Sequence, residues 1–330
     1  MGRHLDVGHP LRGHYQLIDH LGSRVGSLML PPFFRDGTDT ESIESHVEQL
    51  RVSIPTMTEP GWYLVDVDSP IGSLTSGILV ASDLRPDRPS VIFHHGIGEL
   101  PADTSFNRIF RPERDLIDAN LIAVQAPFHT SSSALTTGIA SLRSVLIMQA
   151  ASVELIEAIR AWVGEQTTES VIVSGVSLGG FITNLHHIVY QSADRYIPLL
   201  AGLAQDDVFL NSSIRRYVSR TALDEPDTIS DRLNFTDAFA ETDPTNVHPL
   251  LAKHDRVVRF DPQAASYHGR PIETIGTGHL TGAVAAQALR SHIARFVRLE
   301  QTRRDRTSDS KYTQRRWHYA DRFSDIDWLN

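Results

Sequence analysis

Hydrophobic positions repeat at helical spacing in the first 60 residues of the chain. Ile43, Val47 and Leu50 fall on one helix face after Thr38–Glu41, which has the form of a capping box, and residues 17–28 show a similar spacing. The sequence LPPFFRDG between these two segments is typical of a turn. Residues 1–60 are therefore predicted to form a helical extension.

The pattern becomes strand-like after residue 60. GWYLVDVDS (61–69) and LTSGILVAS (74–82) alternate or run apolar around a Pro-Ile-Gly turn, which predicts a hairpin. Farther along, short apolar segments are separated by segments of helix length, a pattern typical of a parallel sheet covered by helices on both faces. The predicted strands are 90–95, 121–127, 170–175, 196–205, 247–255 and 271–278, and the predicted helices are 106–119, 146–166, 178–191 and 282–300.

Two segments depart from this alternation of strands and helices. Residues 208–246 are polar and helical in parts, and they lie between two predicted strands. They are predicted to form a small cap over one end of the sheet. Residues 300–330 are rich in both acidic and basic side chains and are predicted to be a charged C-terminal tail.

Composition narrows the classes of function. The net charge of −9 argues against a general affinity for nucleic acid or anionic membranes. The absence of cysteine excludes disulfides, thiolate zinc sites and cysteine nucleophiles. No apolar run approaches the roughly 20 residues that a membrane-spanning helix needs, so no integral membrane segment is expected. The first 16 residues lack the apolar core of a signal peptide, which predicts a cytoplasmic location.

The 16 histidines form no recognisable metal-binding motif, and neither a metal nor another cofactor is expected. His186 and His187 are adjacent on a predicted helix and lie off its apolar stripe, so they are expected to face solvent or the cap. His94 and His95 are adjacent at the end of a predicted strand, where successive side chains point to opposite faces.

The stretch VIVSGVSLGG (171–180) carries the clearest chemical signal. It places Ser177 between Gly175 and Gly179, where a predicted strand turns at once into a predicted helix. This is the G-x-S-x-G pattern of a nucleophile elbow, in which the serine hydroxyl projects from the sheet edge. The amides at the start of the helix favour negative charge beside that hydroxyl.

The strand, elbow and helix together resemble the α/β-hydrolase superfamily, and the resemblance extends over about residues 61–299. It implies an α/β-hydrolase fold, with a mostly parallel central sheet, an N-terminal antiparallel hairpin, helices on both faces and a small helical cap at 208–246. It also implies a catalytic triad in the chain order serine, acid, histidine. Ser177, Asp255 and His279 occur in that order; Asp255 ends one predicted strand, and His279 follows the next. Asp206 and Asp207 follow the preceding strand and remain alternatives for the acid.

The same resemblance implies an oxyanion hole. The sequence His95-Gly96-Ile97-Gly98 is similar to the H-G-x-G pattern of the superfamily. The amide of Leu178, with that of Ile97 or Gly96, is therefore expected to bind the substrate oxygen.

Candidate substrate-pocket residues lie in three loops or helices around this site. His95 belongs to the oxyanion loop, and His129 follows the predicted strand 121–127, where it either lines the pocket or caps the next helix. Phe209 and Ile214 lie in the predicted cap and are expected to form one wall of an acyl pocket.

The resemblance implies a serine hydrolase, similar to esterases and lipases, that cleaves a carboxylic ester or a related small acyl compound. Amidase, thioesterase and acyltransferase chemistry use the same machinery and are alternatives. A non-catalytic binding protein with the same fold is the competing class. The sequence leaves monomer and homo-oligomer open.

Overall fold

A computed structural model of the protein describes residues 31–302. Within this range, nine strands form one sheet in the order β1-β2-β3-β5-β4-β6-β7-β8-β9. Strands β1 to β3 are antiparallel, β3 pairs antiparallel with β5, and all the remaining pairs are parallel. The strands are β1 (Arg51–Val52), β2 (Gly61–Ser69), β3 (Gly72–Val80), β4 (Ser90–His94), β5 (Asn120–Gln125), β6 (Val171–Val176), β7 (Arg195–Leu199), β8 (Leu250–Ala252) and β9 (Glu273–Ile275).

This topology confirms the predicted sheet, including the hairpin of β2 and β3 at its start. The hairpin register runs from Gly61 opposite Val80 to Ser69 opposite Gly72. Strand β4 is central and buried along its whole length, which explains why its sequence is apolar without alternation. Ile92 of β4 packs in one hydrophobic cluster, whereas Val91 and Phe93 pack in the other, so the strand serves both faces of the sheet.

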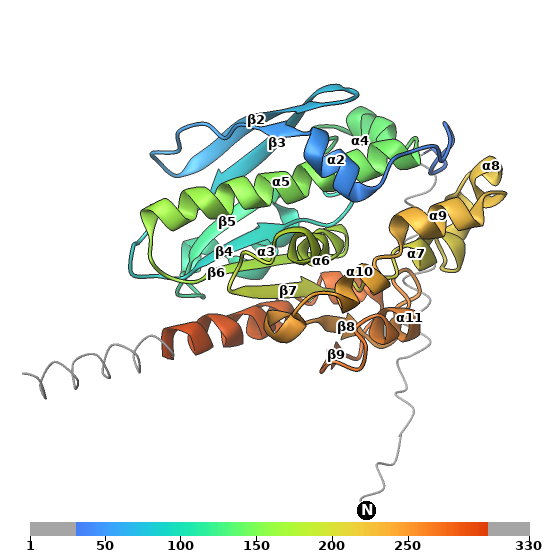
Figure 1. The fold of residues 1–330 in the computed structure, drawn as a ribbon. Coiled ribbons are helices and arrows are strands. Elements are labelled where there is room, and N and C mark those ends of the chain that lie inside the picture. Colours follow the sequence, from blue (N-terminus) through green and yellow to red (C-terminus); the bar gives the residue numbers. More distant parts are fainter. Residues whose placement is uncertain (1–30, 303–330) are drawn as a thin grey trace, which may run out of the picture.

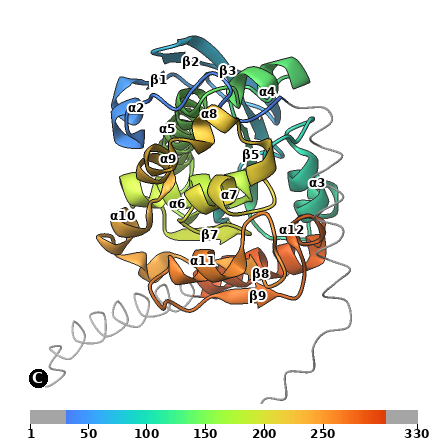
Figure 2. The same ribbon diagram turned by 90° about the vertical axis from the view of Figure 1, so that its right-hand side faces the viewer.

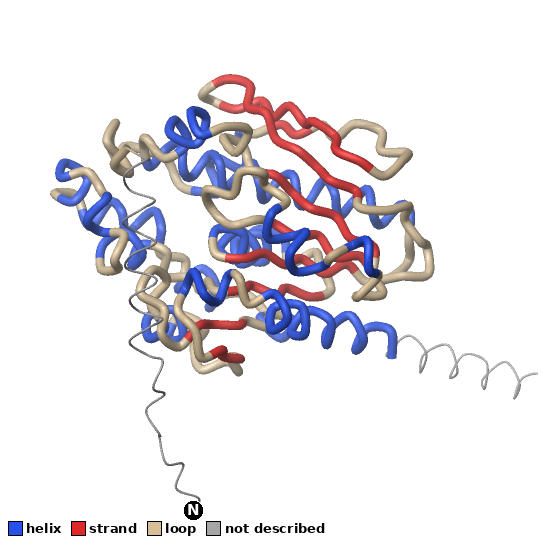
Figure 3. The backbone as a smooth tube through the Cα atoms, turned by 180° about the vertical axis from the view of Figure 1, so that it is seen from behind, coloured by secondary structure: helices blue, strands red, loops and turns tan. Residues whose placement is uncertain are grey.

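Helices cover both faces of the sheet. Figure 1 shows α5 and α6 in front of the strands, and Figure 3 shows the sheet from behind, with the final helix (residues 286–302) running along its lower edge. The helices before the cap are α2 (Ile43–Gln49), α3 (Thr104–Phe110), α4 (Ser132–Gly138), α5 (Leu142–Gln166) and α6 (Leu178–Tyr190).

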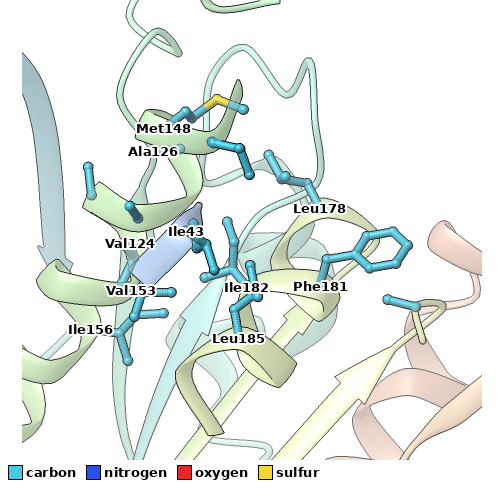
Figure 4. Close-up of a cluster of buried hydrophobic side chains, with 14 of the residues drawn as sticks. Ile43, Val124, Ala126, Met148, Val153, Ile156, Leu178, Phe181, Ile182 and Leu185 are labelled. Carbon is cyan, nitrogen blue, oxygen red and sulfur yellow. The ribbon is translucent and has the colours of Figure 1, made fainter. Parts of the chain in front are cut away.

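The larger hydrophobic cluster lies between the sheet, α5 and α6. Figure 4 shows Leu178, Ile182 and Leu185 of α6 beside side chains of α5, with Ile43 of α2 in the same cluster. All of these side chains are at most 4% exposed. Full burial of a side chain of this size contributes roughly 1.5–3 kcal/mol, so this packing holds the start of α6 firmly against the sheet.

Short helices make up the segment between β7 and β8, as predicted. Figure 2 shows this segment together with α11 and α12 at one side of the molecule. The segment contains α7 (Asp206–Leu210), α8 (Arg220–Leu223), α9 (Pro226–Leu233) and α10 (Thr236–Ala240), and α11 (Phe260–Ala265) and α12 (His279–Ala283) follow it in the chain.

Two local predictions were wrong. Helix α2 begins at Ile43 with Ser42 as its N-cap, whose Oγ accepts a hydrogen bond from the Ser45 amide at 3.3 Å. Thr38 instead donates to the carboxylate of Glu225, because residues 31–42 run across the cap before the helix starts. The predicted helix 106–119 ends at Phe110, since Pro112 has no amide hydrogen and its ring blocks the preceding turn.

Residues 31–60 pack onto the rest of the fold, with β1 paired to β2 and α2 lying against α5. The predicted helix in residues 17–28 and the tail from residue 303 lie outside the described residues. Among residues 31–302, no single helix has the length and apolar composition of a membrane span, although α4 and α5, bent by 108°, satisfy these criteria as a pair.

Candidate active site

Ser177 stands in the tight turn between β6 and α6. Its backbone has φ 56° and ψ −112°, a conformation that is uncommon for any residue other than glycine. The Ser177 amide donates to the carbonyl of Leu199 in β7 at 2.9 Å, and the Ser177 carbonyl accepts from the amide of Phe181 at 3.1 Å. The strained turn is therefore fixed to the neighbouring strand and to the first turn of the helix.

The glycines around Ser177 are required by close backbone contacts. A Cβ atom at Gly175 would lie 2.8 Å from the Cα of Gly179 and closer still to its carbonyl group. A Cβ atom at Gly179 would overlap the carbonyl of His94, at the end of β4, and would lie 2.9 Å from the carbonyl oxygen of His95. The start of α6 thus lies directly against the backbone that leads into the predicted oxyanion loop.

The structure brings Ser177, His279 and Asp255 together. Ser177 Oγ lies 2.9 Å from Nε2 of His279, and Nδ1 of His279 lies 2.7 Å from Oδ2 of Asp255. The side chains of His279 and Asp255 are only 7% and 1% exposed, so water competes little for the hydrogen bond between them. His279 is the first residue of α12, and Asp255 follows β8.

Two backbone amides orient the carboxylate of Asp255. Val257 and Val258 donate to its Oδ1 at 2.8 and 2.7 Å, which directs Oδ2 toward His279. This loop follows the strand in the D-x-V-V sequence at 255–258.

The alternative acids lie elsewhere in hydrogen-bond networks of their own. Asp207 forms a bidentate ion pair with Arg259, and one of its two hydrogen bonds measures 2.9 Å. Asp206 accepts from the hydroxyl of Ser230 at 3.0 Å, and burial raises the pKa of its carboxyl group. The structure therefore places Asp255, and not either of these residues, against His279.

The predicted oxyanion loop follows β4 and lies beside the elbow, because a Cβ atom added at Gly96 would be 3.7 Å from the Cβ of Ser177. The Gly96 amide donates to Oε1 of Glu99 at 2.8 Å, and the other carboxylate oxygen of Glu99 accepts from the Ser105 amide at 2.7 Å. Burial raises the pKa of Glu99. Because the amide of Gly96 is engaged, the amide of Ile97 is the better candidate for the second donor of the oxyanion hole. The first donor, Leu178, is the first residue of α6, so its amide has no intrahelical acceptor.

Three buried histidines hold the oxyanion loop. His95 donates through Nδ1 to the Gly96 carbonyl at 2.7 Å and accepts from the Ala126 amide through Nε2 at 3.0 Å. His129 accepts from the Gly98 amide at 3.2 Å. Burial lowers the pKa of His129, holds that of His95 well below its ordinary value and lowers that of His94 to about 3, so all three rings are neutral near pH 7.

These hydrogen bonds assign His95 and His129 to the support of the loop. The sequence suggested the substrate pocket for His95, and either the pocket or a helix cap for His129. The expectation that His94 and His95 diverge was also wrong, because their rings stack with centroids 4.7 Å apart. Strand β4 ends at His94, so the alternation of side chains along a strand no longer applies to the residue that follows.

The two remaining pocket candidates belong to the cap. Phe209 is 6% exposed, and its ring packs against those of Phe33 and Phe34 at centroid distances of 5.3 and 4.8 Å. Ile214 is partly buried against the same cluster. Both side chains attach the cap to the core in this structure.

A cavity of about 820 Å³ opens beside Asp255, between the 211–216 loop and the 253–262 segment. Sequence reasoning did not find it, although the basic residues around Asp255 in the sequence AKHDR were a signal. Within residues 31–302, no group of three or more His, Asp or Glu side chains is arranged to hold a metal ion.

Comparisons with known proteins support the fold. No family model and no curated protein matches the chain. A solved structure of DcsB in complex with its substrate analogue is similar at a TM-score of 0.50 and 13% identity, covering 73% of this chain and 100% of that one. An acetyl xylan esterase from Paenibacillus sp. R4 is similar at a TM-score of 0.47 and 12% identity, covering 89% of this chain and 96% of that one.

The acylaminoacyl peptidase of Pyrococcus horikoshii is similar at a TM-score of 0.48 and 14% identity, over 74% of this chain. The chain spans only 41% of the length of that peptidase. At these identities the similarity concerns the fold alone.

Proposed function

We propose that this chain, which has the α/β-hydrolase fold, is a serine hydrolase that cleaves a carboxylic ester or a related acyl compound. The observation that carries the proposal is the continuous hydrogen-bonded series from Ser177 Oγ through His279 to Asp255, with separations of 2.9 and 2.7 Å. A hydroxyl is a weak nucleophile until a base removes its proton, and this series supplies that base together with a carboxylate that orients it.

In the proposed reaction, Ser177 Oγ attacks the carbonyl carbon of the substrate while its proton passes to Nε2 of His279. The carbonyl oxygen becomes an oxyanion that accepts hydrogen bonds from the amides of Leu178 and Ile97. His279 then returns the proton to the departing alcohol, which leaves an acyl group on Ser177. Water, activated in turn by His279, attacks the acyl carbon and releases the acid.

Asp255 is proposed to stabilise the protonated form of His279 during both steps. Its Oδ1 is held by the amides of Val257 and Val258, so the carboxylate does not need to reorient when the charge develops. Preorganised groups of this kind lower the barrier because they are already aligned before the reaction starts.

The test is a panel of short-chain and medium-chain nitrophenyl esters, with a thioester and an anilide included, assayed with the wild type and with Ser177→Ala. We expect kcat to fall by about four to six orders of magnitude in the variant. Asp255→Asn should lower kcat by about four orders of magnitude with a small change in KM, whereas Asp206→Asn should leave kcat within a few-fold of the wild-type value. Hydrolysis that survives in Ser177→Ala would contradict the proposal.

One observation favours the competing class of a non-catalytic binding protein. The Glu99 carboxylate engages the Gly96 amide, so the oxyanion loop carries a negatively charged acceptor in this structure. A fluorophosphonate probe separates the two classes, since it labels only a serine that is activated as a nucleophile. Labelling at Ser177 that is lost in His279→Ala supports the enzyme, and an unlabelled wild type supports the binding protein.

A further inference from the structure

We propose that the cavity beside Asp255 binds a phosphate or carboxylate group carried at the far end of the acyl substrate. This inference rests on the proposed function, because it assigns a substrate class to the same site. The cavity has a volume of about 820 Å³, which lies within the range of roughly 300–1,000 Å³ that is usual for small-molecule sites.

Positive charge dominates the wall of this cavity. Its lining includes five side chains that carry full positive charge and only two carboxylates, Asp255 and Asp261. The five are Arg215, Arg216, Lys253, Arg256 and Arg259. The protein as a whole has a net charge of −9, so this local excess of positive charge runs against the balance of the molecule.

Two acidic groups at or near this wall, those of Asp255 and Asp207, are already engaged. Asp255 accepts from His279 and from two backbone amides. Asp207 does not line the cavity and forms its ion pair with Arg259. Asp261 is exposed at the edge of the cavity. The four basic side chains of the 215–216 and 253–256 segments therefore outnumber the two carboxylates that line the same cavity. An excess of charge of one sign in a concave surface attracts ligands of the opposite sign.

Two of the guanidinium groups are held in place by the fold. Arg215 donates through Nη1 to the Leu210 carbonyl at 2.8 Å, and a guanidinium group has five N–H donors. Arg216 lies over the ring of Tyr217, with its Cζ 4.8 Å from the ring centroid. Guanidinium groups that are fixed in this way match the planar, bidentate geometry of carboxylate and phosphate oxygens.

The position of the cavity connects it with the reaction. It is lined by residues that follow β7 and β8, the same carboxyl edge of the sheet at which Ser177 follows β6. Asp255 belongs to both the cavity wall and the hydrogen-bonded series, so the cavity lies two hydrogen bonds from the nucleophile. The proposed substrate therefore has its acyl group at Ser177 and its anionic end in the cavity.

The first experiment measures turnover with two pairs of esters, each made of an anionic ester and a neutral ester of similar size. One pair places a carboxylate on the acyl side (mono-nitrophenyl succinate against nitrophenyl butyrate), and the other places it on the leaving group (carboxyphenyl butyrate against carbamoylphenyl butyrate). A phosphate-bearing analogue of the preferred pair then distinguishes the two anions. We expect kcat/KM for one anionic ester to exceed that of its neutral partner by about ten-fold or more.

The variants are Arg215→Gln, Lys253→Gln and their combination. In the double variant the ratio of anionic to neutral turnover should fall toward one, while turnover of the neutral ester stays within a few-fold of the wild type. Arg270→Gln is the matched control, because Arg270 is exposed, does not line the cavity and precedes β9 at the opposite edge of the sheet. The wild-type preference should also weaken in 1 M salt, where the screening length falls to about 3 Å.

The second experiment measures binding without turnover, so that failure of the catalytic proposal is distinguishable from failure of this one. Inorganic phosphate and succinate are titrated calorimetrically into Ser177→Ala and into Ser177→Ala with both cavity substitutions. Binding that is lost with the cavity substitutions supports the anion site, even where no ester is turned over. Equal turnover of charged and neutral esters by the wild type, or equally weak binding by both proteins, overturns it.

Discussion

The contact between Gly179 and the end of β4 predicts a large effect of the smallest possible substitution. In Gly179→Ala the new methyl group would lie 2.7 Å from the carbonyl carbon of His94 and would overlap its oxygen, whereas ordinary contact begins at 3.4 Å. These are backbone atoms of a central strand that is paired on both sides. They cannot rotate away as a side chain would, so α6 must shift by about 1 Å.

The expected cost follows from this displacement. Overpacked cores lose about 1–3 kcal/mol, and the upper end applies here because the overlapping atoms belong to the backbone. The intrinsic helix preference of alanine over glycine returns at most about 1 kcal/mol. A net loss of about 2 kcal/mol corresponds to a Tm lower by about 4–8 °C in a domain of this size. Because Ser177 moves with the helix, kcat/KM should fall by about a hundred-fold.

The assay compares Gly179→Ala with Gly164→Ala by thermal unfolding and by ester turnover. Gly164 lies in α5, and a Cβ atom there has no neighbour within 4 Å, so the same chemical change should raise stability by up to about 1 kcal/mol and leave turnover unchanged. If Gly179→Ala unfolds at the same temperature as Gly164→Ala and keeps wild-type turnover, the close contact does not constrain the elbow and the reasoning is refuted.

Two further predictions concern the oxyanion loop. Glu99→Gln removes a negative charge from the loop, but it also turns an NH₂ group toward the Gly96 or the Ser105 amide, so that one amide loses its acceptor and the loop its anchor. Because the lost anchor outweighs the removed charge, kcat should fall by about ten-fold or more with little change in KM. Steady-state kinetics beside the exposed control Glu165→Gln checks this. His94 has a folded-state pKa of about 3, below that of an unfolded chain, so the unfolded state binds the proton first and stability is lost as pH falls below about 6.5. Between pH 7.5 and 5.5 the free energy of unfolding should therefore fall in both proteins, but by about 1 kcal/mol less in His94→Gln than in the wild type. Urea titrations at both pH values measure this, with His268→Gln as the control.

The sequence predicted the arrangement of the central sheet because each strand carries a local signal and the order of strands is constrained by topology. The meeting of Ser177, Asp255 and His279 was predicted in the same way, since each lies at or shortly after the end of a strand. The carboxyl ends of parallel strands meet at one edge of the sheet. The choice of Asp255 over Asp207 depends on more distant contacts, because Arg259, 52 residues away in the chain, engages Asp207.

Side chains whose environment comes from distant segments were predicted less well. His186 and His187 fall off the apolar stripe of α6, yet both are buried. His186 lies 3.2 Å from a carboxylate oxygen of Glu157 in α5. His187 donates to the carbonyl of Asp243 in the cap segment, which agrees with the expected contact with the cap. A helix with α5 on one side and the cap segment on another has no solvent face at these positions, and the pattern of one helix cannot show how many neighbours it will have.

The proposed oxyanion hole depends on a balance of charges that the structure makes explicit. Burial keeps His94, His95 and His129 neutral, so the rings beneath the loop add no positive charge to stabilise an oxyanion. Glu99, on the same loop, contributes a negative charge whenever it is ionised, and its engagement of the Gly96 amide removes one donor. Stabilisation of the developing charge therefore falls to the amides of Ile97 and Leu178 and to the positive end of the α6 dipole. Because the fit of Gly179 against His94 places the start of α6 beside this loop, the packing that orders the elbow also sets the electrostatics of the reaction.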